Sequence, residues 1–205
     1  MQRRGLLCVF LLALGVRFAE PSAGPFPTRA HAQAEEDVAT RPAASVAESR
    51  KQFKLGVEEA RRGRWPEALL AFQVSYALVP NPAALFNLAG AQRQTGKLLV
   101  SNANYRRFTS STSAGITATH RKAAETQMAR IEASIPRLRV LVDGLQPDDR
   151  LLLDDKRVYL NELDHDLWLD PGPHTVSVHR PGGHEEVRRI SLAEGDRRLM
   201  QFRVF

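Results

Sequence analysis

The sequence predicts an α+β protein, with helical hairpins in the first part of the folded chain and a small antiparallel β-sandwich in the second. Apolar residues recur at steps of three and four from Glu48 to Ile135, as on one face of a helix. After Pro136 the apolar step becomes two, which is typical of half-buried strands. Within the helical part, several large and small residues repeat with an offset of 33 positions.

The first 32 residues predict an export signal. Arg3 and Arg4 precede an apolar run over residues 5–16, and Ala30-His31-Ala32 fits a small-x-small cleavage site. This run is too short to span a bilayer, which needs about 20 apolar residues. We therefore expect a signal peptide over 1–32 and a mature chain in the periplasm, in the medium or at the cell surface, without a transmembrane segment.

Residues 33–47 predict a flexible leader, because they contain Ala, Glu and Pro without periodicity. The start of this leader depends on the cleavage site, and cleavage after Ala19 or Ala23 remains open.

Four helices are predicted between Glu48 and Phe108, and glycine and proline mark their ends. Gly63 breaks the first helix, Pro66 suits the first turn of the second, and Gly96 ends the third. The helices are expected over about 48–62, 67–78, 82–95 and 98–108.

The 33-residue offset relates the first two of these helices to the next two. It places Leu55 on Leu88, Gly63 on Gly96, Trp65 on Leu98, and Phe72 on Tyr105. A helix–turn–helix unit with a period in this range indicates a solenoid, in which each hairpin buries its apolar face against the next.

This segment resembles tetratricopeptide repeats (TPR). The first copy follows the family pattern with Leu55-Gly56, Gly63, Trp65, Ala68, Phe72 and Pro80. The second copy has Leu88-Ala89, Gly96, Leu98, Ser101 and Tyr105, with Ala89 in place of glycine and Ser101 in place of alanine. The resemblance implies a protein–protein interaction module whose first helices line a peptide groove. A further helix over 116–135 is expected to cover the open end of the second repeat.

The groove residues expected from this resemblance are Gln52, Asn87, Ala91 and Gln94. Some proteins of the family clamp a peptide's terminal carboxylate with Lys and Asn side chains. Asn87 matches one of these clamp residues, whereas Phe53 and Val57 stand where two others are expected.

After Pro136 the chain predicts short strands separated by turns rich in Asp, Gly and Pro. The strands are expected around 138–142, 151–153, 167–169, 175–178, 187–192 and 199–204. The run from Leu151 to Asp155 and the run from Pro171 to Gly183 resemble the PEGA family of bacterial surface-associated β-domains. The predicted domains are a signal peptide (1–32), a leader (33–47), two TPR-like repeats with a capping helix (48–136) and a PEGA-like β-domain (137–205).

The single cysteine, Cys8, lies in the apolar N-terminal run, so the folded part is expected to have no disulfide and no thiol chemistry. The charge is uneven: residues 49–136 hold thirteen Lys or Arg against five Asp or Glu, a net of +8, whereas residues 137–205 have a net of −2. Arginine pairs such as Arg106-Arg107 have few aromatic neighbours, so we expect no nucleic-acid binding.

No motif predicts an enzyme or a cofactor. The serines at 109–113 lack a glycine elbow, and the nearby His120 sits beside Arg121 and Lys122. The evenly spaced His174, His179 and His184 suggest a metal site, but positions five apart on a strand face opposite sides, so no metal is expected.

Together these patterns predict an exported, non-enzymatic scaffold protein of the bacterial envelope that binds another envelope protein or a peptide through its repeats. The alternative is a carbohydrate- or peptidoglycan-binding protein that contacts the cell wall through the β-domain, with Tyr159 and Trp168 as the candidate aromatic residues. Exposure of both rings on one sheet surface would favour that alternative.

Overall fold

A computed structural model describes residues 42–203 of the chain. The described residues form two compact units, which we call the first unit (42–95 and 104–125) and the second unit (96–103 and 126–203). The fold is α+β, as the sequence predicts, with helices before strands. The predicted signal peptide and residues 33–41 of the predicted leader lie outside the described residues.

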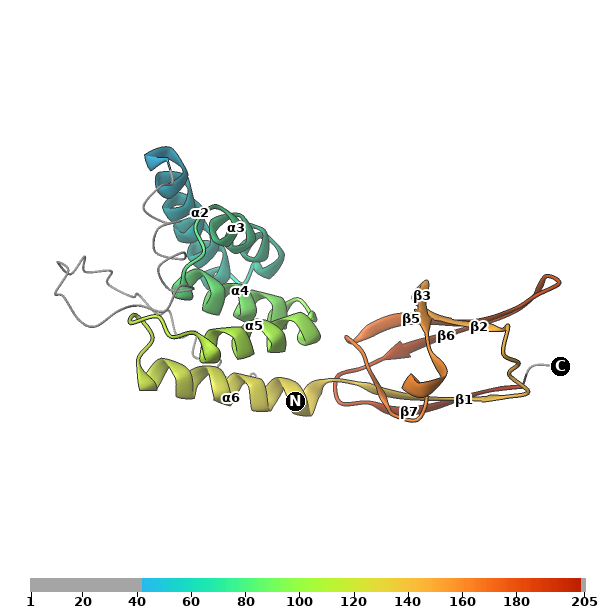
Figure 1. Cartoon of the computed structure of the whole chain (residues 1–205). Helices are drawn as coiled ribbons and strands as arrows, with labels where there is room; N and C mark the ends of the chain where they lie inside the picture. Colours follow the sequence, from blue (N-terminus) through green and yellow to red (C-terminus); the bar gives the residue numbers. More distant parts are fainter. Residues whose placement is uncertain (1–41, 204–205) are drawn as a thin grey trace, which may run out of the picture. The chain divides into compact units, whose positions relative to one another are not determined.

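Five described helices precede the strands (Figure 1). They are α2 (Ala43–Arg61), α3 (Trp65–Leu78), α4 (Pro82–Gln94), α5 (Leu98–Ser110) and α6 (Ala118–Ser134). The helix α2 begins five residues before Glu48, so residues 43–47 are helical and not part of a flexible leader. Three of these five residues are Ala, which has the highest helix propensity, and Pro42 stands directly before the first turn. None of the described helices contains a stretch long and apolar enough to cross a bilayer.

The helix ends repeat with the 33-residue period of the sequence. Helices α2 and α4 end at Arg61 and Gln94, and helices α3 and α5 begin at Trp65 and Leu98. Gly63 and Gly96 have φ angles of 75° and 76°, a left-handed conformation that glycine adopts without steric cost. The two glycines therefore end both helices in the same way.

Helices α2 and α3 lie side by side and bury the Phe72 ring between them (Figure 1). Phe72 is 1% exposed and packs against Phe53, with ring centroids 5.7 Å apart. A Cβ atom at Gly56 would lie 2.7 Å from the Phe72 ring, so only glycine allows this approach. In the next pair, Phe86 of α4 makes edge-on contacts with Tyr105 and Phe108 of α5.

Two small sheets form most of the second unit. The strands are β1 (Arg137–Asp143), β2 (Arg150–Leu153), β3 (Lys156–Val158), β4 (Leu167–Trp168), β5 (Gly172–Arg180), β6 (His184–Leu192) and β7 (Arg197–Arg203). One sheet has the order β4-β1-β7 and the other has the order β3-β2-β5-β6. Both sheets contribute to one buried cluster, with Val140 and Phe202 from the first and Val176 and Val178 from the second.

The pairing of β1 with β7 differs from the antiparallel arrangement that the sequence predicts. These strands run parallel, in register from Arg137↔Arg197 to Asp143↔Arg203. The other strand pairs are antiparallel. Strands β1 and β7 are the first and last of the sheet-forming segment, so no tight turn joins them and no antiparallel hairpin is imposed on the pair.

The turn between β2 and β3 holds two residues in the left-handed region. Asp154 and Asp155 have φ angles of 50° and 63°, and Leu153 pairs with Lys156 across the turn. A two-residue hairpin loop with both φ angles positive is a type I′ turn, which strongly prefers glycine at its second position.

We therefore expect Asp155→Gly to raise the free energy of unfolding by about 0.5–1 kcal/mol, because it relieves a left-handed conformation in a residue with a Cβ. Urea unfolding followed by circular dichroism measures the change. The matched variant Asp154→Gly is expected to lower stability, because the Asp154 carboxylate accepts a hydrogen bond from Thr175 N at 2.9 Å. A lower midpoint for Asp155→Gly would contradict the assignment of the turn.

Candidate binding pocket

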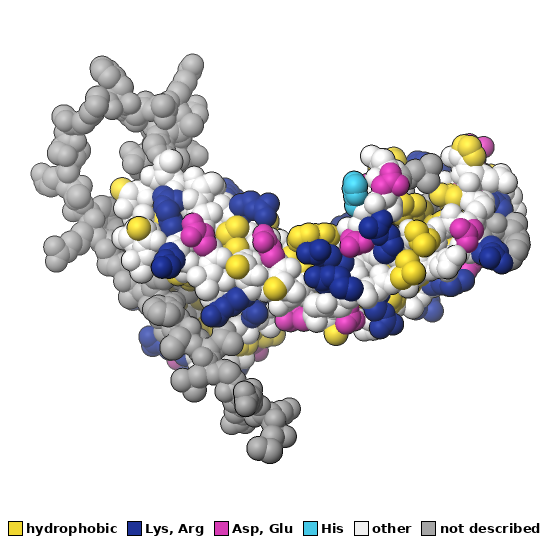
Figure 2. All heavy atoms as spheres, turned by 90° about the horizontal axis from the view of Figure 1, so that it is seen from below, with side chains coloured by type: hydrophobic (Ala, Val, Ile, Leu, Met, Phe, Trp, Pro, Cys, Tyr) yellow, Lys and Arg dark blue, Asp and Glu magenta, His cyan; other side chains and the backbone are white. Residues whose placement is uncertain are grey.

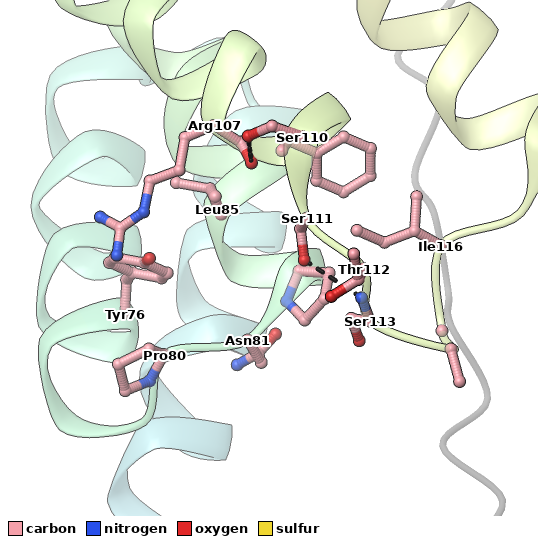
Figure 3. A pocket seen from close by; sticks show the side chains of 14 residues that line it. Tyr76, Pro80, Asn81, Leu85, Arg107, Ser110, Ser111, Thr112, Ser113 and Ile116 are labelled. Carbon is pink, nitrogen blue, oxygen red and sulfur yellow. Dashed lines mark hydrogen bonds between the residues drawn. The ribbon is translucent and has the colours of Figure 1, made fainter. Parts of the chain in front are cut away.

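The first unit contains a pocket of about 810 Å³ (Figure 3). Its walls come from the C-terminal ends of α3 and α5, the loop before α4 and the loop before α6. The lining residues are Tyr76, 80–82, Leu85, Arg107, Phe108 and 110–116. We call it the Arg107 pocket.

The loop between α3 and α4 is fixed by its own sequence. Asn81 caps α4: its Oδ1 accepts a hydrogen bond from Ala84 N at 2.9 Å, and its Nδ2 donates to Val79 O at 3.0 Å. Pro80 and Pro82 restrict the backbone on either side of this cap. The positive end of the α4 dipole therefore lies at the pocket wall.

The loop between α5 and α6 is fixed by Arg121 of α6. Its guanidinium donates to the carbonyl oxygens of Thr109 and Ser111, and the second contact is 2.6 Å long. Ser111 Oγ accepts a hydrogen bond from Ser113 N, and the buried Ile116 anchors the end of the loop. This arrangement places a row of hydroxyl groups along one wall of the pocket.

Arg107 and Tyr76 lie across the pocket from these hydroxyl groups (Figure 3). The Arg107 guanidinium stands 5.7 Å from the centroid of the Tyr76 ring, within reach of a cation–π interaction. Arg107 makes no ion pair with any of residues 42–203. The contact with Tyr76 restricts the side chain, so the positive charge is held at the wall, and no carboxylate of the described part of the chain pairs with it.

The sequence around the pocket has no acidic residue. Between Glu67 and Glu125 there are six Lys or Arg and no Asp or Glu. On the face of the molecule seen in Figure 2, Lys and Arg side chains are interspersed with Asp and Glu. The segment from 68 to 124, which contains the pocket lining, has six Lys or Arg and no Asp or Glu, a net charge of +6 that favours a negatively charged ligand.

The four groove residues predicted from the sequence do not line this pocket. Ala91 is fully buried in the core between the helices, which leaves it no surface for a ligand. Gln52 donates to Glu48 Oε1 at 2.7 Å, and Asn87 donates to Ala83 O at 2.8 Å. Gln94 is partly exposed near the end of α4. Both Gln52 and Asn87 thus use a donor within their own helix.

The histidines of the second unit have separate surroundings. His174 and His179 pair with different residues of β6, Ile190 and Glu185, at opposite ends of β5. Among the described residues, no three His, Cys, Asp or Glu side chains form a group suited to a metal ion. The side chain of His184 lies outside what the structure describes.

His179 lies between a serine and a glutamate, a combination that invites comparison with a hydrolase. Ser177 Oγ is 3.0 Å from His179 Nε2, and Glu185 Oε1 is 3.6 Å from the same nitrogen. In a catalytic triad the acid contacts the opposite ring nitrogen, where it orients the imidazole for its work as a base. Glu185 therefore competes with Ser177 for one nitrogen and does not orient the ring as a triad requires.

His174 joins three segments of the second unit. Its Nδ1 lies 2.7 Å from Asp154 Oδ2, and its Nε2 lies 2.7 Å from Asp170 O. The Asp170 carboxylate in turn accepts a hydrogen bond from Leu99 N in the first turn of α5. Burial lowers the pKa of His174, but the hydrogen bonds to Asp154 and Asp170 outweigh it and raise the pKa above its usual range. Both partner atoms are acceptors, so only the doubly protonated ring donates to both.

Because its folded-state pKa is raised, His174 contributes stability that is fully present below the unfolded-state pKa of about 6.5 and is lost as pH rises through the folded-state pKa. We expect the free energy of unfolding to fall between pH 6 and pH 8, as measured by urea titration at each pH. The variant His174→Gln should lose this part of the pH dependence, because it lacks the imidazole whose pKa folding raises. An unchanged pH profile in the variant would contradict this role.

Comparison with known proteins assigns no family to the chain. No protein-family model matches it, and no curated protein matches it. The resemblances to tetratricopeptide repeats and to the PEGA family therefore remain predictions, based on the residues that carry them.

Proposed function

We propose that the chain is an exported, non-enzymatic interaction protein of the bacterial cell envelope. The first unit binds another protein or a peptide, and the second unit serves as a spacer or makes a contact with the envelope. The observation that carries this proposal is the Arg107 pocket, an open site whose arginine makes no ion pair with residues 42–203 and lies in a segment without acidic residues.

In this proposal the helical hairpins are two tetratricopeptide repeats. The 33-residue spacing of the helix ends supports this assignment, as do the matching conformations of Gly63 and Gly96. The burial of Phe72 and Tyr105 supports it further, because both aromatic residues fill the interior at corresponding positions. Repeat modules of this kind use their surfaces for binding.

The second unit is a PEGA-like β-sandwich in this proposal. Its support is the shared core of the two sheets and the turn at Asp154-Asp155, where an apolar strand meets the family's turn position. The contacts of Glu185 and Ser177 with one nitrogen of His179 support a role other than hydrolysis.

Carbohydrate binding through the second unit is the second candidate, because both candidate aromatic residues are exposed. Tyr159 is 58% exposed and Trp168 is 44% exposed. Trp168 belongs to β4 of the three-stranded sheet, whereas Tyr159 follows β3 of the four-stranded sheet. Each ring also stacks with an arginine, Arg157 on Tyr159 and Arg137 on Trp168. The two rings thus do not form one platform on one sheet, which favours the interaction protein.

Photo-cross-linking in cells that produce the whole chain tests the proposed function. A cross-linking amino acid at Leu70, which is 64% exposed on α3, is expected to give a discrete adduct with a second protein. The same cross-linking amino acid placed at Leu199, which is 62% exposed on β7, detects partners of the second unit. The absence of an adduct from Leu70 would contradict binding through the first unit. Co-sedimentation of the chain with purified peptidoglycan that is lost in Trp168→Ala would support the second candidate instead.

A further inference from the structure

We propose that the Arg107 pocket binds a short acidic peptide segment of a partner protein. A carboxylate of the segment faces Arg107, and a neighbouring apolar side chain lies on the buried residues of the pocket floor. This inference rests on the proposed function, which it deepens by assigning the site and the chemical class of the partner.

The charge of the pocket selects a carboxylate. Arg107 is exposed, is held over Tyr76 at 5.7 Å and makes no ion pair with any residue from 42 to 203. Its planar guanidinium presents donors in a fork that matches the two oxygens of a carboxylate. The segment between Glu67 and Glu125 offers no acidic side chain that competes for this position. The α4 N-terminus, whose residues Asn81 and Pro82 also line the pocket, adds a second, weaker attraction for negative charge.

The size and floor of the pocket select a peptide over a single small anion. A volume of about 810 Å³ is within the range of sites that hold organic ligands and far exceeds what one phosphate or acetate fills. The apolar surface of the floor comes from Leu85 and Ile116, which are 5% and 7% exposed, and the lining also includes the fully buried Phe108. Such a surface accepts an apolar side chain and gains stability by removing it from water.

The rim suits the backbone of the same peptide. Ser111 accepts a hydrogen bond from Ser113 N, and its own hydroxyl hydrogen remains available to a ligand carbonyl. Ser110 donates to Arg107 O and retains its lone pairs as acceptors for an amide N–H. Arg121 already fixes the end of α5 and the loop that follows it, so binding does not have to order either segment.

Fluorescence anisotropy with the whole chain tests the proposal. The probe is a fluorescein-labelled, amidated peptide of sequence Ser-Leu-Glu-Glu-Leu-Ser, and the comparison peptide has Gln in place of both Glu residues. The acidic probe is expected to bind at least about ten-fold more tightly, since a charge-assisted hydrogen bond differs from a neutral one by this factor or more.

Three variants locate the site. Arg107→Gln is expected to weaken binding of the acidic probe about ten-fold, and Arg107→Lys is expected to retain part of it. Arg106→Gln removes the same charge from the adjacent position of α5, which does not line the pocket, and is expected to change affinity less than about two-fold. Unchanged thermal unfolding of each variant shows that the effect is not a loss of fold.

Each contrary result overturns the proposal in a distinct way. Equal binding of the acidic and Gln peptides excludes carboxylate recognition. Equal losses in Arg106→Gln and Arg107→Gln show attraction to net charge only. Displacement of the probe by inorganic phosphate at the peptide's own concentration identifies a simple anion site. A cross-link from Leu70 to a partner that persists in Arg107→Gln keeps the proposed function and rejects this pocket, whereas no cross-link from the first unit rejects the proposed function itself.

Discussion

Phe72→Ala is expected to lower the free energy of unfolding by about 3–5 kcal/mol, the range for removing a fully buried aromatic side chain. Phe72 is 1% exposed and fills the space between α2 and α3, where it contacts Phe53 at 5.7 Å between ring centroids. Helix α2 approaches the same ring closely at Gly56, so the substitution leaves a cavity between the two helices. Urea unfolding followed by far-UV circular dichroism measures the change. The control Leu70→Ala, at an exposed position of α3, is expected to lower the free energy of unfolding by less than about 0.5 kcal/mol.

A substitution at Gly56 tests the same contact, because the sign of its effect on stability depends on whether the Phe72 ring is present. In the wild-type protein, Gly56→Ala places a Cβ atom 2.7 Å from the Phe72 ring and is expected to destabilise by about 1–2 kcal/mol. In the Phe72→Ala background the clash is gone, and the higher helix propensity of Ala is expected to stabilise by up to about 1 kcal/mol. The same sign in both backgrounds would contradict the close approach of the helix to the ring.

The bounds of the helices could be predicted closely because residues at the helix ends determine where each helix begins and ends. Gly63 and Gly96 adopt positive φ, which few other residues tolerate, and Pro82 fits the first turn of α4. The early start of α2 could not be predicted from periodicity, because residues 43–47 carry no apolar stripe. Ser49 near this end is fixed by a tertiary contact, in which its hydroxyl donates to Ser75 O at 2.9 Å.

Strand pairing was less predictable, because two strands that pair can lie far apart in the sequence. Alternating residues predicted β1 and β7 as strands, but their parallel pairing depends on how the segments between them fold. The short strand β3, Lys156–Val158, is not among the strands predicted from the sequence. Strand β3 forms because Asp154 and Asp155 adopt positive φ angles, and this two-residue turn reverses the direction of the chain directly after β2.

The pocket could not be predicted because its walls meet only in the folded chain. Tyr76 and Arg107 are 31 positions apart and come together through the packing of the helices. One signal was present in the sequence: the serine-rich loop at 109–113 follows Arg106-Arg107 in a segment without acidic residues. The predicted groove residues depend on the family pattern, whereas the pocket depends on the charge and the loops of this chain.

Phe202→Ala is expected to have a comparable effect in the second unit, a loss of about 3–5 kcal/mol. Phe202 lies on β7, is 0% exposed and belongs to the core that both sheets share. The Arg188 guanidinium stands 4.9 Å from its ring centroid and donates to Gln201 O at 2.7 Å, so the ring also supports a contact between β6 and the edge of β7.

The matched control is Leu199→Ala, three positions earlier on the same strand, where the side chain is 62% exposed. It is expected to change stability by less than about 0.5 kcal/mol, since little apolar surface returns to water. Equal losses in Phe202→Ala and Leu199→Ala would contradict the inward and outward faces assigned to β7. An additional Arg188→Ala substitution should cost less in Phe202→Ala than in the wild-type protein, because the ring on which the guanidinium rests is already absent.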